Sequence, residues 1–209
     1  MILKPELEDY KIIGYYLGKV TIGLGIMMAI PFILGILFAE YQPAIDFLFS
    51  IAITLLIGYS LTAICYTKKD LATMHAMSVA SISWLMAMFV SAIPIYLSGH
   101  YGSYLDACFE AMSGYATTGL SLAVDLDHMA YAHNFWRHFT MFIGGQGIVV
   151  IALTFLFKGT AGAFRIYVGE ARDEKILPNV IDTARFIWLV SFVYLAIGAT
   201  ALTISGMLG

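Results

Sequence analysis

The chain has 209 residues, of which 60% are apolar and only 12% are charged, and its formal net charge is −3. Soluble domains are roughly half apolar and about a quarter charged, so this composition excludes a soluble globular domain. With a mean hydropathy of +0.84, the sequence predicts an all-α integral membrane protein.

Five uncharged stretches are long enough to cross the hydrocarbon core of a bilayer. Each has roughly the 20 residues that are needed, at 1.5 Å per residue, to span about 30 Å. They are residues 20–39, 47–66, 76–97, 139–157 and 186–208. The first could instead be a cleaved signal peptide, but its apolar region is too long and acidic residues flank it. We therefore expect about five transmembrane helices.

The basic residues are distributed unevenly over the connecting segments. Most of them lie before the first stretch, between the second and third, or between the fourth and fifth. These are Lys4, Lys11, Lys19, Lys68, Lys69, Lys158, Arg165, Arg172, Lys175 and Arg185. The two other connections contain only Arg137. By the positive-inside rule, we expect a cytoplasmic N-terminus, with residues 98–138 and the C-terminus facing outward.

Acidic residues gather on the predicted outer side. They are Glu40, Asp46, Asp106, Glu110, Asp125 and Asp127. Such an acidic surface would raise the local cation concentration at an entrance. For Glu40 and Asp46, an ordinary role as loop residues is at least as compatible with the sequence.

The long outer segment between the third and fourth stretches contains a short helical pattern. Ser103, with Asp106 three residues later, resembles a capping box, and apolar residues recur at helical spacing from Leu105 to Met112. We expect a helix over about residues 104–113. Roughly ten residues reach only half way across the hydrocarbon, so this helix would end, with its last carbonyls unpaired, at membrane depth. Because non-helical backbone is tolerated there only when it is buried in protein or lines a water-filled path, we predict a re-entrant pore helix followed by a filter loop.

The polar run MSGYATTGLS, residues 112–121, would be that filter loop. Its backbone carbonyls could replace the hydration shell of a cation, and the candidate ion ligands are those of Ala116, Thr117, Thr118, Gly119 and Leu120. Gly114 and Gly119 supply backbone freedom where a Cβ would clash, so Gly114 would support the filter. An ordinary extracellular loop with Gly and Thr as turn residues is an open alternative.

Three further features flank the filter. Glu110 precedes it by one helical turn and would support it, either by hydrogen-bonding to the filter backbone or by pairing with Arg137. Trp136 and Arg137 stand at the outer end of the fourth stretch, where residues of these types commonly anchor a helix at the membrane interface. Three glycines in the middle of that stretch, Gly144, Gly145 and Gly147, favour close helix packing over a gating hinge.

Residues for metal or enzyme chemistry do not converge in the sequence. His128, His133 and His138 are spaced by five residues, which rotates successive positions on a helix by about 140°, so they share no face for zinc or haem. An intramembrane hydrolase would need Ser113 or Ser121 with His128, but no G-x-S-x-G elbow surrounds either serine. We expect no enzyme activity, no cofactor and no metal beyond a transported ion.

The run DACFEAMSGYATTGLS, together with WRHFTMFIGGQGIVVIALTFL at residues 136–156, resembles the first pore unit of the Trk/Ktr/HKT superfamily of potassium uptake proteins. The resemblance implies a potassium-channel-like architecture with four such units around one pore. Here it implies a cytoplasmic N-terminus and two leading helices over residues 1–75, a helix-pore-helix unit over 76–157, a cytoplasmic linker over 158–185 and the first helix of a second, incomplete unit over 186–209. Gly119 would be the filter glycine, which in that superfamily favours potassium over sodium.

The implied function is potassium transport across the plasma membrane of a bacterial or archaeal cell, as a subunit or N-terminal portion of a Trk/Ktr-type uptake system. Because three of the four filter segments are missing, a pore would need further copies of the chain or a second polypeptide. The alternative is a non-conducting membrane fragment or assembly subunit. Cytosolic nucleotide-binding regulatory subunits are the other partners that the resemblance implies, since the chain carries no nucleotide-binding fingerprint of its own; no nucleic acid is expected.

Overall fold

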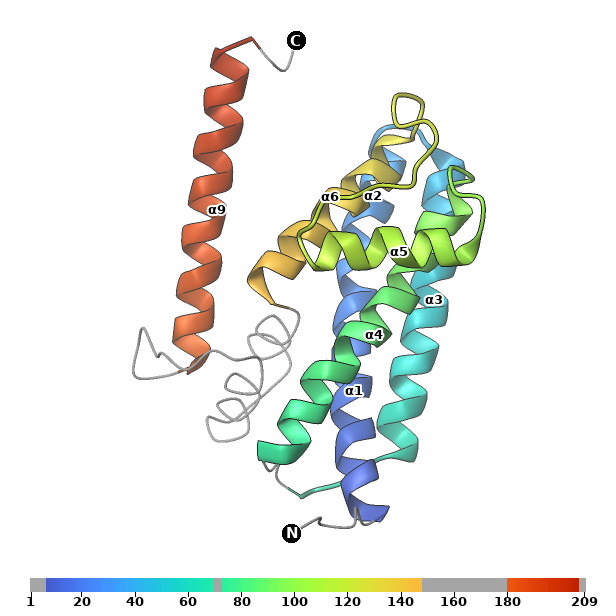
Figure 1. Ribbon diagram of the computed structural model, residues 1–209, viewed down its shortest axis with the longest axis vertical. Coiled ribbons are helices and arrows are strands. Elements are labelled where there is room, and N and C mark those ends of the chain that lie inside the picture. Colours follow the sequence, from blue (N-terminus) through green and yellow to red (C-terminus); the bar gives the residue numbers. More distant parts are fainter. Residues whose placement is uncertain (1–6, 70–72, 148–179, 207–209) are drawn as a thin grey trace.

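The computed structural model describes residues 7–69, 73–147 and 180–206, and all regular elements within these ranges are helices. They are α1 (Leu7–Met27), α2 (Ala29–Leu37), α3 (Tyr41–Ile64), α4 (Thr73–Leu97), α5 (Tyr104–Tyr115), α6 (Tyr131–Gln146) and α9 (Val180–Ile204). The long helices α1, α3 and α4 lie alongside one another, α2 continues α1, and the short helix α5 lies across the bundle near one end (Figure 1). The expectation of an all-α protein is confirmed.

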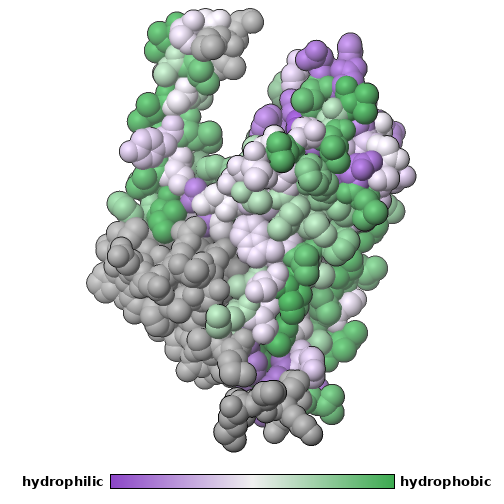
Figure 2. All heavy atoms as spheres, viewed as in Figure 1, coloured by the Kyte–Doolittle hydropathy of each residue, from purple (hydrophilic) through white to green (hydrophobic). Residues whose placement is uncertain are grey.

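Four helical segments in the described ranges are long and apolar enough to cross a membrane: Leu7–Leu37, Tyr41–Ile64, His75–Leu97 and Arg185–Ile204. They correspond to the first, second, third and fifth predicted spans. The fourth predicted span is described only as far as residue 147, where it belongs to α6, and its remaining residues lie outside the described ranges. Apolar residues cover the middle of the bundle in Figure 2, between hydrophilic ends, which is the surface that a bilayer requires.

The first span begins earlier than the uncharged stretch did, at Leu7 instead of residue 20. The reason is that charged residues of its first turns are paired with the start of α4 and the segment before it. Nε2 of His75 lies 2.9 Å from Oδ1 of Asp9, and Nζ of Lys69 lies 3.2 Å from Oε2 of Glu8. A search for uncharged runs cannot include such residues, although they continue the same helix.

The break between α1 and α2 at Met28 has a local cause. Pro31 has no amide hydrogen to donate to the carbonyl of residue 27, so the helical ladder loses one bond there. The Met28 side chain is fully buried, and its sulfur accepts a hydrogen bond from Thr54 of α3 at 3.8 Å. The interrupted span thus stays packed against α3.

Helices α1 and α3 approach each other closely because glycines face each other at their crossing. A Cβ on Gly18 would lie 2.8 Å from the carbonyl oxygen of Gly58, and one on Gly58 would lie 3.0 Å from the carbonyl oxygen of Gly18. Small residues allow such backbone contact between membrane helices. This crossing fixes α3, and the N-terminal half of α3 packs against α6.

The turn between α2 and α3 holds the N-terminus of α6. The two carboxylate oxygens of Glu40 accept hydrogen bonds from the amides of Tyr131 and Ala132, at 2.8 and 3.0 Å. These are donors that a helix start leaves without an intrahelical partner, and a negative charge is favourable there. One turn into α3, Asp46 is only 6% exposed, and its Oδ2 lies 3.4 Å from Nε2 of the buried His133. Glu40 is thus a loop residue that also holds the start of α6, whereas Asp46 is a buried helical residue and not a loop residue.

Candidate functional site

Helix α5 begins where the sequence predicts. The side chain of Ser103 accepts a hydrogen bond from the amide of Asp106 at 3.2 Å, which caps the helix. Ala107 and Ala111 are fully buried, so α5 packs closely on the bundle. Near its other end, the hydroxyl of Tyr115 lies 2.6 Å from Oγ of Ser91 on α4. Helix α5 is therefore fixed at both ends by specific hydrogen bonds.

The C-terminus of α5 ends in a tight turn centred on Thr117. The amide of Thr117 donates to the carbonyl of Gly114 at 2.9 Å, and the amide of Thr118 donates to the carbonyl of Ser113 at 3.0 Å. This is a Schellman motif, and its left-handed position is usually glycine. Here that position is Thr117, with φ of +55°. The carbonyls of Ser113 and Gly114 are thus bonded, where the sequence predicted unpaired groups, and the turn places a β-branched residue in the left-handed region, which is rare.

The segment that follows keeps this unusual backbone. The φ angles are −75° at Ala116, +55° at Thr117 and +74° at Gly119, and Thr118 between the last two is not in the left-handed region. Residues held in sparsely populated conformations cluster at functional sites. Thr117, which has the rare conformation, is one of the residues predicted to be ion ligands.

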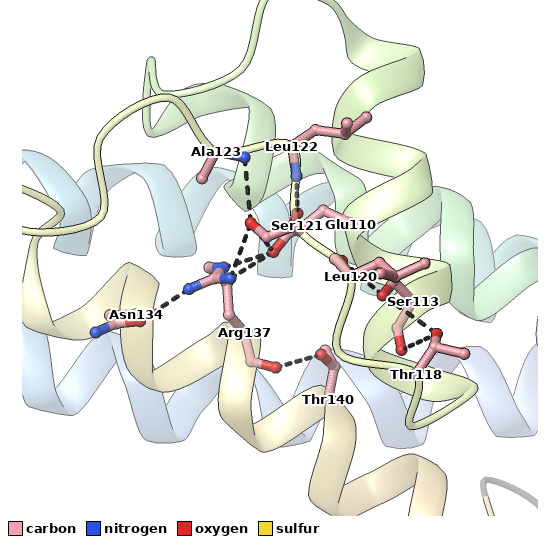
Figure 3. A network of polar contacts seen from close by, with 10 residues as sticks. All are labelled: Glu110, Ser113, Thr118, Leu120, Ser121, Leu122, Ala123, Asn134, Arg137 and Thr140. Atoms are coloured by element: carbon pink, nitrogen blue, oxygen red, sulfur yellow. Dashed lines mark hydrogen bonds and ion pairs between the residues drawn. The ribbon is translucent and has the colours of Figure 1, made fainter.

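From Gly119 to Ala123, no backbone group is hydrogen-bonded to another backbone group of the described residues. Side chains of α5 hold this segment instead (Figure 3). Oγ of Ser113 donates to the carbonyl of Leu120 at 2.6 Å, and Glu110 accepts hydrogen bonds from Oγ of Ser121 and from the amide of Leu122, each at 3.0 Å. Because Glu110 and Ser113 are three residues apart, they project from the same face of α5.

Glu110 also binds Arg137 of α6. Nε and one terminal nitrogen of Arg137 lie 2.7 and 2.6 Å from Oε1 of Glu110, and the guanidinium also donates to Oγ of Ser121 at 3.2 Å and to Oδ1 of Asn134 at 3.1 Å. Glu110 is 5% exposed and Arg137 is 8% exposed. Glu110 thus pairs with Arg137, and it also binds the backbone at Leu122, two residues beyond the predicted ion ligands.

The interpretation of Trp136 and Arg137 as interfacial anchors is wrong. Trp136 is fully buried and donates a hydrogen bond from its ring nitrogen to the carbonyl of Ser91 at 3.3 Å. The first turns of α6 lie inside the bundle, against α2, α3, α4 and α5. Their aromatic and basic side chains therefore contact protein, and the anchoring rule does not apply to them.

Glycines of α5 and α6 bring these two helices into contact next to residues 116–123, which include the predicted ion ligands and are called the filter segment below. A Cβ on Gly144 would overlap with the backbone carbonyl of Tyr115, and a Cβ on Gly114 would overlap with Oγ1 of Thr140. The close packing predicted for this glycine group is therefore confirmed at Gly144. The group lies at the end of α6 and not in the middle of a helix, since Gly147 follows the last turn with φ of +83°.

The loop between residue 123 and α6 carries exposed charge. Oδ2 of Asp125 lies 2.7 Å from Nδ1 of His128, and this hydrogen bond lowers the pKa of the Asp125 carboxyl. The three histidines examined as metal ligands have separate environments. Within the described residues, no group of three His, Cys, Asp or Glu side chains is placed to hold a metal ion.

An apolar groove of about 780 Å³ lies between α1, α2, α6 and α9. Its lining includes Ile30, Phe139 and Trp188 and contains no residue of the filter segment. The groove is therefore separate from the candidate ion site.

Comparison with known proteins places the chain in a family. The family model of the cation transport protein TrkH matches residues 21–207. A protein of Methanocaldococcus jannaschii named as an uncharacterized cation transporter is 34% identical over 206 residues, which cover 99% of this chain and 43% of that protein. The Trk system potassium uptake protein TrkH of Halomonas elongata is 27% identical over 91% of this chain and 41% of its own length, and TrkH of Escherichia coli K12 is 30% identical over 67% and 30%. The chain spans less than half the length of these relatives. It belongs to the TrkH family of cation transport proteins.

Proposed function

We propose that this chain contributes the first selectivity-filter segment of a Trk-type potassium uptake system in the plasma membrane. The observation that carries the proposal is the backbone that follows α5, in which Thr117 is left-handed and side chains of α5 bind the chain at Leu120 and Leu122. Two of the relatives are named as potassium uptake proteins, which supports potassium as the ion.

The chemistry of the site fits a dehydrated cation. Backbone carbonyls replace the hydration shell of an ion in a filter, and the C-terminal end of a helix carries a partial negative charge that favours cations. Of the five candidate carbonyls, that of Leu120 already accepts a hydrogen bond from Ser113. We therefore propose the carbonyls of residues 116–119 as the principal ion ligands of this segment.

A working pore would need more than this chain. Residues 116–122 are exposed along one side of the bundle, and such backbone at membrane depth requires protein or water beside it. We propose that further filter segments, from other copies or from a second polypeptide, complete the pore, and that cytosolic nucleotide-binding subunits regulate it. Because the relatives are more than twice as long, an assembly subunit that does not conduct by itself is the second candidate.

Replacing Gly119 with serine tests the filter assignment. A side chain at φ of +74° costs about 1–2 kcal/mol of backbone strain, so the carbonyls of the segment should shift. The chain is expressed in a bacterium without its own potassium uptake systems, and rubidium uptake is measured. In Gly119→Ser, we expect the preference for potassium over sodium to fall about tenfold relative to the wild type. Gly119→Arg should abolish uptake, because its guanidinium would occupy the cation path.

The matched control is Gly99→Ser, in the turn after α4. Gly99 has φ of +76° and nothing within 4 Å of its Cβ position, so serine meets the same strain away from the filter. Unchanged selectivity in Gly119→Ser, or an equal loss in Gly99→Ser, would remove Gly119 from the filter. No uptake by a chain that is present in the membrane would favour the non-conducting assembly subunit.

The orientation is tested with single cysteines. In a background where Cys65 and Cys108 are alanine, a cysteine at Asp127 should react with an impermeant thiol reagent in intact cells, and one at Lys68 only after permeabilisation. Both positions are exposed, and Lys68 lies in the basic segment between α3 and α4. Labelling of position 68 in intact cells would reverse the predicted topology.

A further inference from the structure

We infer that Arg137 is a positioning residue that fixes the outer half of the filter segment through Glu110 and Ser121. The inference rests on the proposed function, because it assigns Arg137 a role in the geometry of that filter. It concerns a side chain for which the sequence suggested membrane anchoring or a pairing with Glu110, but no role in positioning the segment.

The first step of the argument is that the segment cannot position itself. In helices and sheets, backbone hydrogen bonds set where each carbonyl points. From Gly119 to Ala123 the backbone has no such bonds to described residues, and three side-chain contacts take their place. One, from Ser113, holds the inner part at Leu120, whereas the two contacts with Glu110 hold the outer part at Ser121 and Leu122.

The second step is that Glu110 needs Arg137 to do this. A buried carboxylate without a counter-charge is strongly disfavoured, so it would take up a proton or turn towards water. Arg137 supplies the charge with two nitrogens on Oε1, and its planar guanidinium fixes the orientation of the carboxylate. The other carboxylate oxygen is then directed at the amide of Leu122.

The third step is that Arg137 is itself held in place. Asn134, one turn earlier on α6, accepts a hydrogen bond from the guanidinium. Arg137 also donates directly to Ser121. In Figure 3 the guanidinium lies between Asn134 on one side and Glu110 with Ser121 on the other. Arg137 thereby connects the rigid helix α6 to a segment that has no backbone hydrogen bonds to the described residues.

The fourth step separates positioning from stability. A buried ion pair contributes little net stability compared with apolar residues of the same shape, whereas its specific geometry can determine one arrangement of the chain. Here that geometry includes two charged groups, Glu110 and Arg137, that bind the segment at Ser121 and Leu122. Loss of Arg137 also leaves Glu110 buried without its counter-charge and lowers stability, so the positioning role is judged from exchange at residues 120–123 relative to the rest of the chain.

Hydrogen exchange of the 209-residue chain in lipid nanodiscs, read by mass spectrometry on peptides that cover residues 118–124, tests the inference without requiring transport. Arg137→Gln should speed exchange in this segment about tenfold, since a hydrogen bond to a charged group is lost. Arg137→Lys keeps the positive charge but loses the planar guanidinium that binds Glu110 through two nitrogens. We therefore expect the exchange rate of the segment to rise only about threefold in this variant. If the glutamine variant fails to insert, the lysine variant decides alone.

Glu40→Gln is the matched control, because it weakens another carboxylate contact to α6. It should speed exchange at the start of α6 and leave residues 118–124 unchanged. The inference is overturned if neither Arg137 variant changes the exchange of the segment, if lysine is no better than glutamine, or if Glu40→Gln loosens the segment equally. If selectivity is unchanged in Gly119→Ser but the Arg137 variants show the expected exchange, the proposed function is rejected and the positioning role remains. If selectivity falls in Gly119→Ser but the Arg137 variants leave exchange unchanged, only the role of Arg137 is rejected.

Discussion

Gly144→Ala should lower the stability of the chain by about 2–3 kcal/mol, a large effect for the addition of one methyl group. The new Cβ would overlap with the backbone carbonyl of Tyr115, at the end of α5. A flexible side chain could move aside, but a backbone carbonyl in a capped helix end cannot move without displacing Ala116 and Thr117. The apparent melting temperature in detergent, measured by near-UV circular dichroism, would report the loss.

Gly145→Ala, one residue further along, is the control. Among the residues that the structure describes, its Cβ would meet only Cγ2 of Thr117, at 3.9 Å, which is an ordinary van der Waals contact. Because alanine is a better helix former than glycine by about 1 kcal/mol, this variant should be as stable as the wild type or slightly more stable. Equal destabilisation by the two substitutions would mean that α6 does not pack against Tyr115 as described, and the glycine contact behind the filter would have to be rejected.

Glu110→Leu is expected to have the largest effect on stability, about 3–5 kcal/mol, because it leaves the guanidinium of Arg137 buried without its counter-charge. Arg137 is only 8% exposed, so water cannot solvate it in place of the carboxylate. The double variant Glu110→Leu with Arg137→Leu removes both charges, and it should recover a large part of the loss. Unfolding of the single and double variants by denaturant in mixed micelles gives the coupling between the two sites.

A double-mutant cycle separates this explanation from simple loss of packing. Groups that contact each other show an interaction energy of about 0.5–3 kcal/mol, whereas independent sites add. If the double variant is destabilised by the sum of the two single effects, Glu110 and Arg137 are not paired, and the arrangement in Figure 3 would be incorrect. Recovery of stability in the double variant would establish Glu110 and Arg137 as one structural unit. The hydrogen-exchange experiment on Arg137 then tests whether this unit positions residues 118–124.

Much of the architecture could be predicted because it depends on properties that are local in the chain. Uncharged stretches gave the helices α3, α4 and α9 to within a few residues at most of their ends. Ser103 was correctly identified as the start of α5 because an N-cap is a contact between residues three apart. The helix ran to Tyr115, two residues beyond its predicted end, since a Schellman turn with a left-handed threonine has no sequence signal comparable to glycine.

The sequence by itself determined that the chain is a helical membrane protein, where the helices lie and which polar run follows the short one, since hydrophobicity and periodicity are read along the chain. Only the tertiary structure decided which charged residues are buried. Arg137 meets Glu110 across 27 residues of sequence, and Glu40 meets the start of α6 across 91. Rules for interfacial anchors and outer acidic loops assume that such side chains face lipid headgroups or water. That assumption fails here because a buried charge is stabilised by its partner, and the partner comes from a distant helix that only the fold brings close.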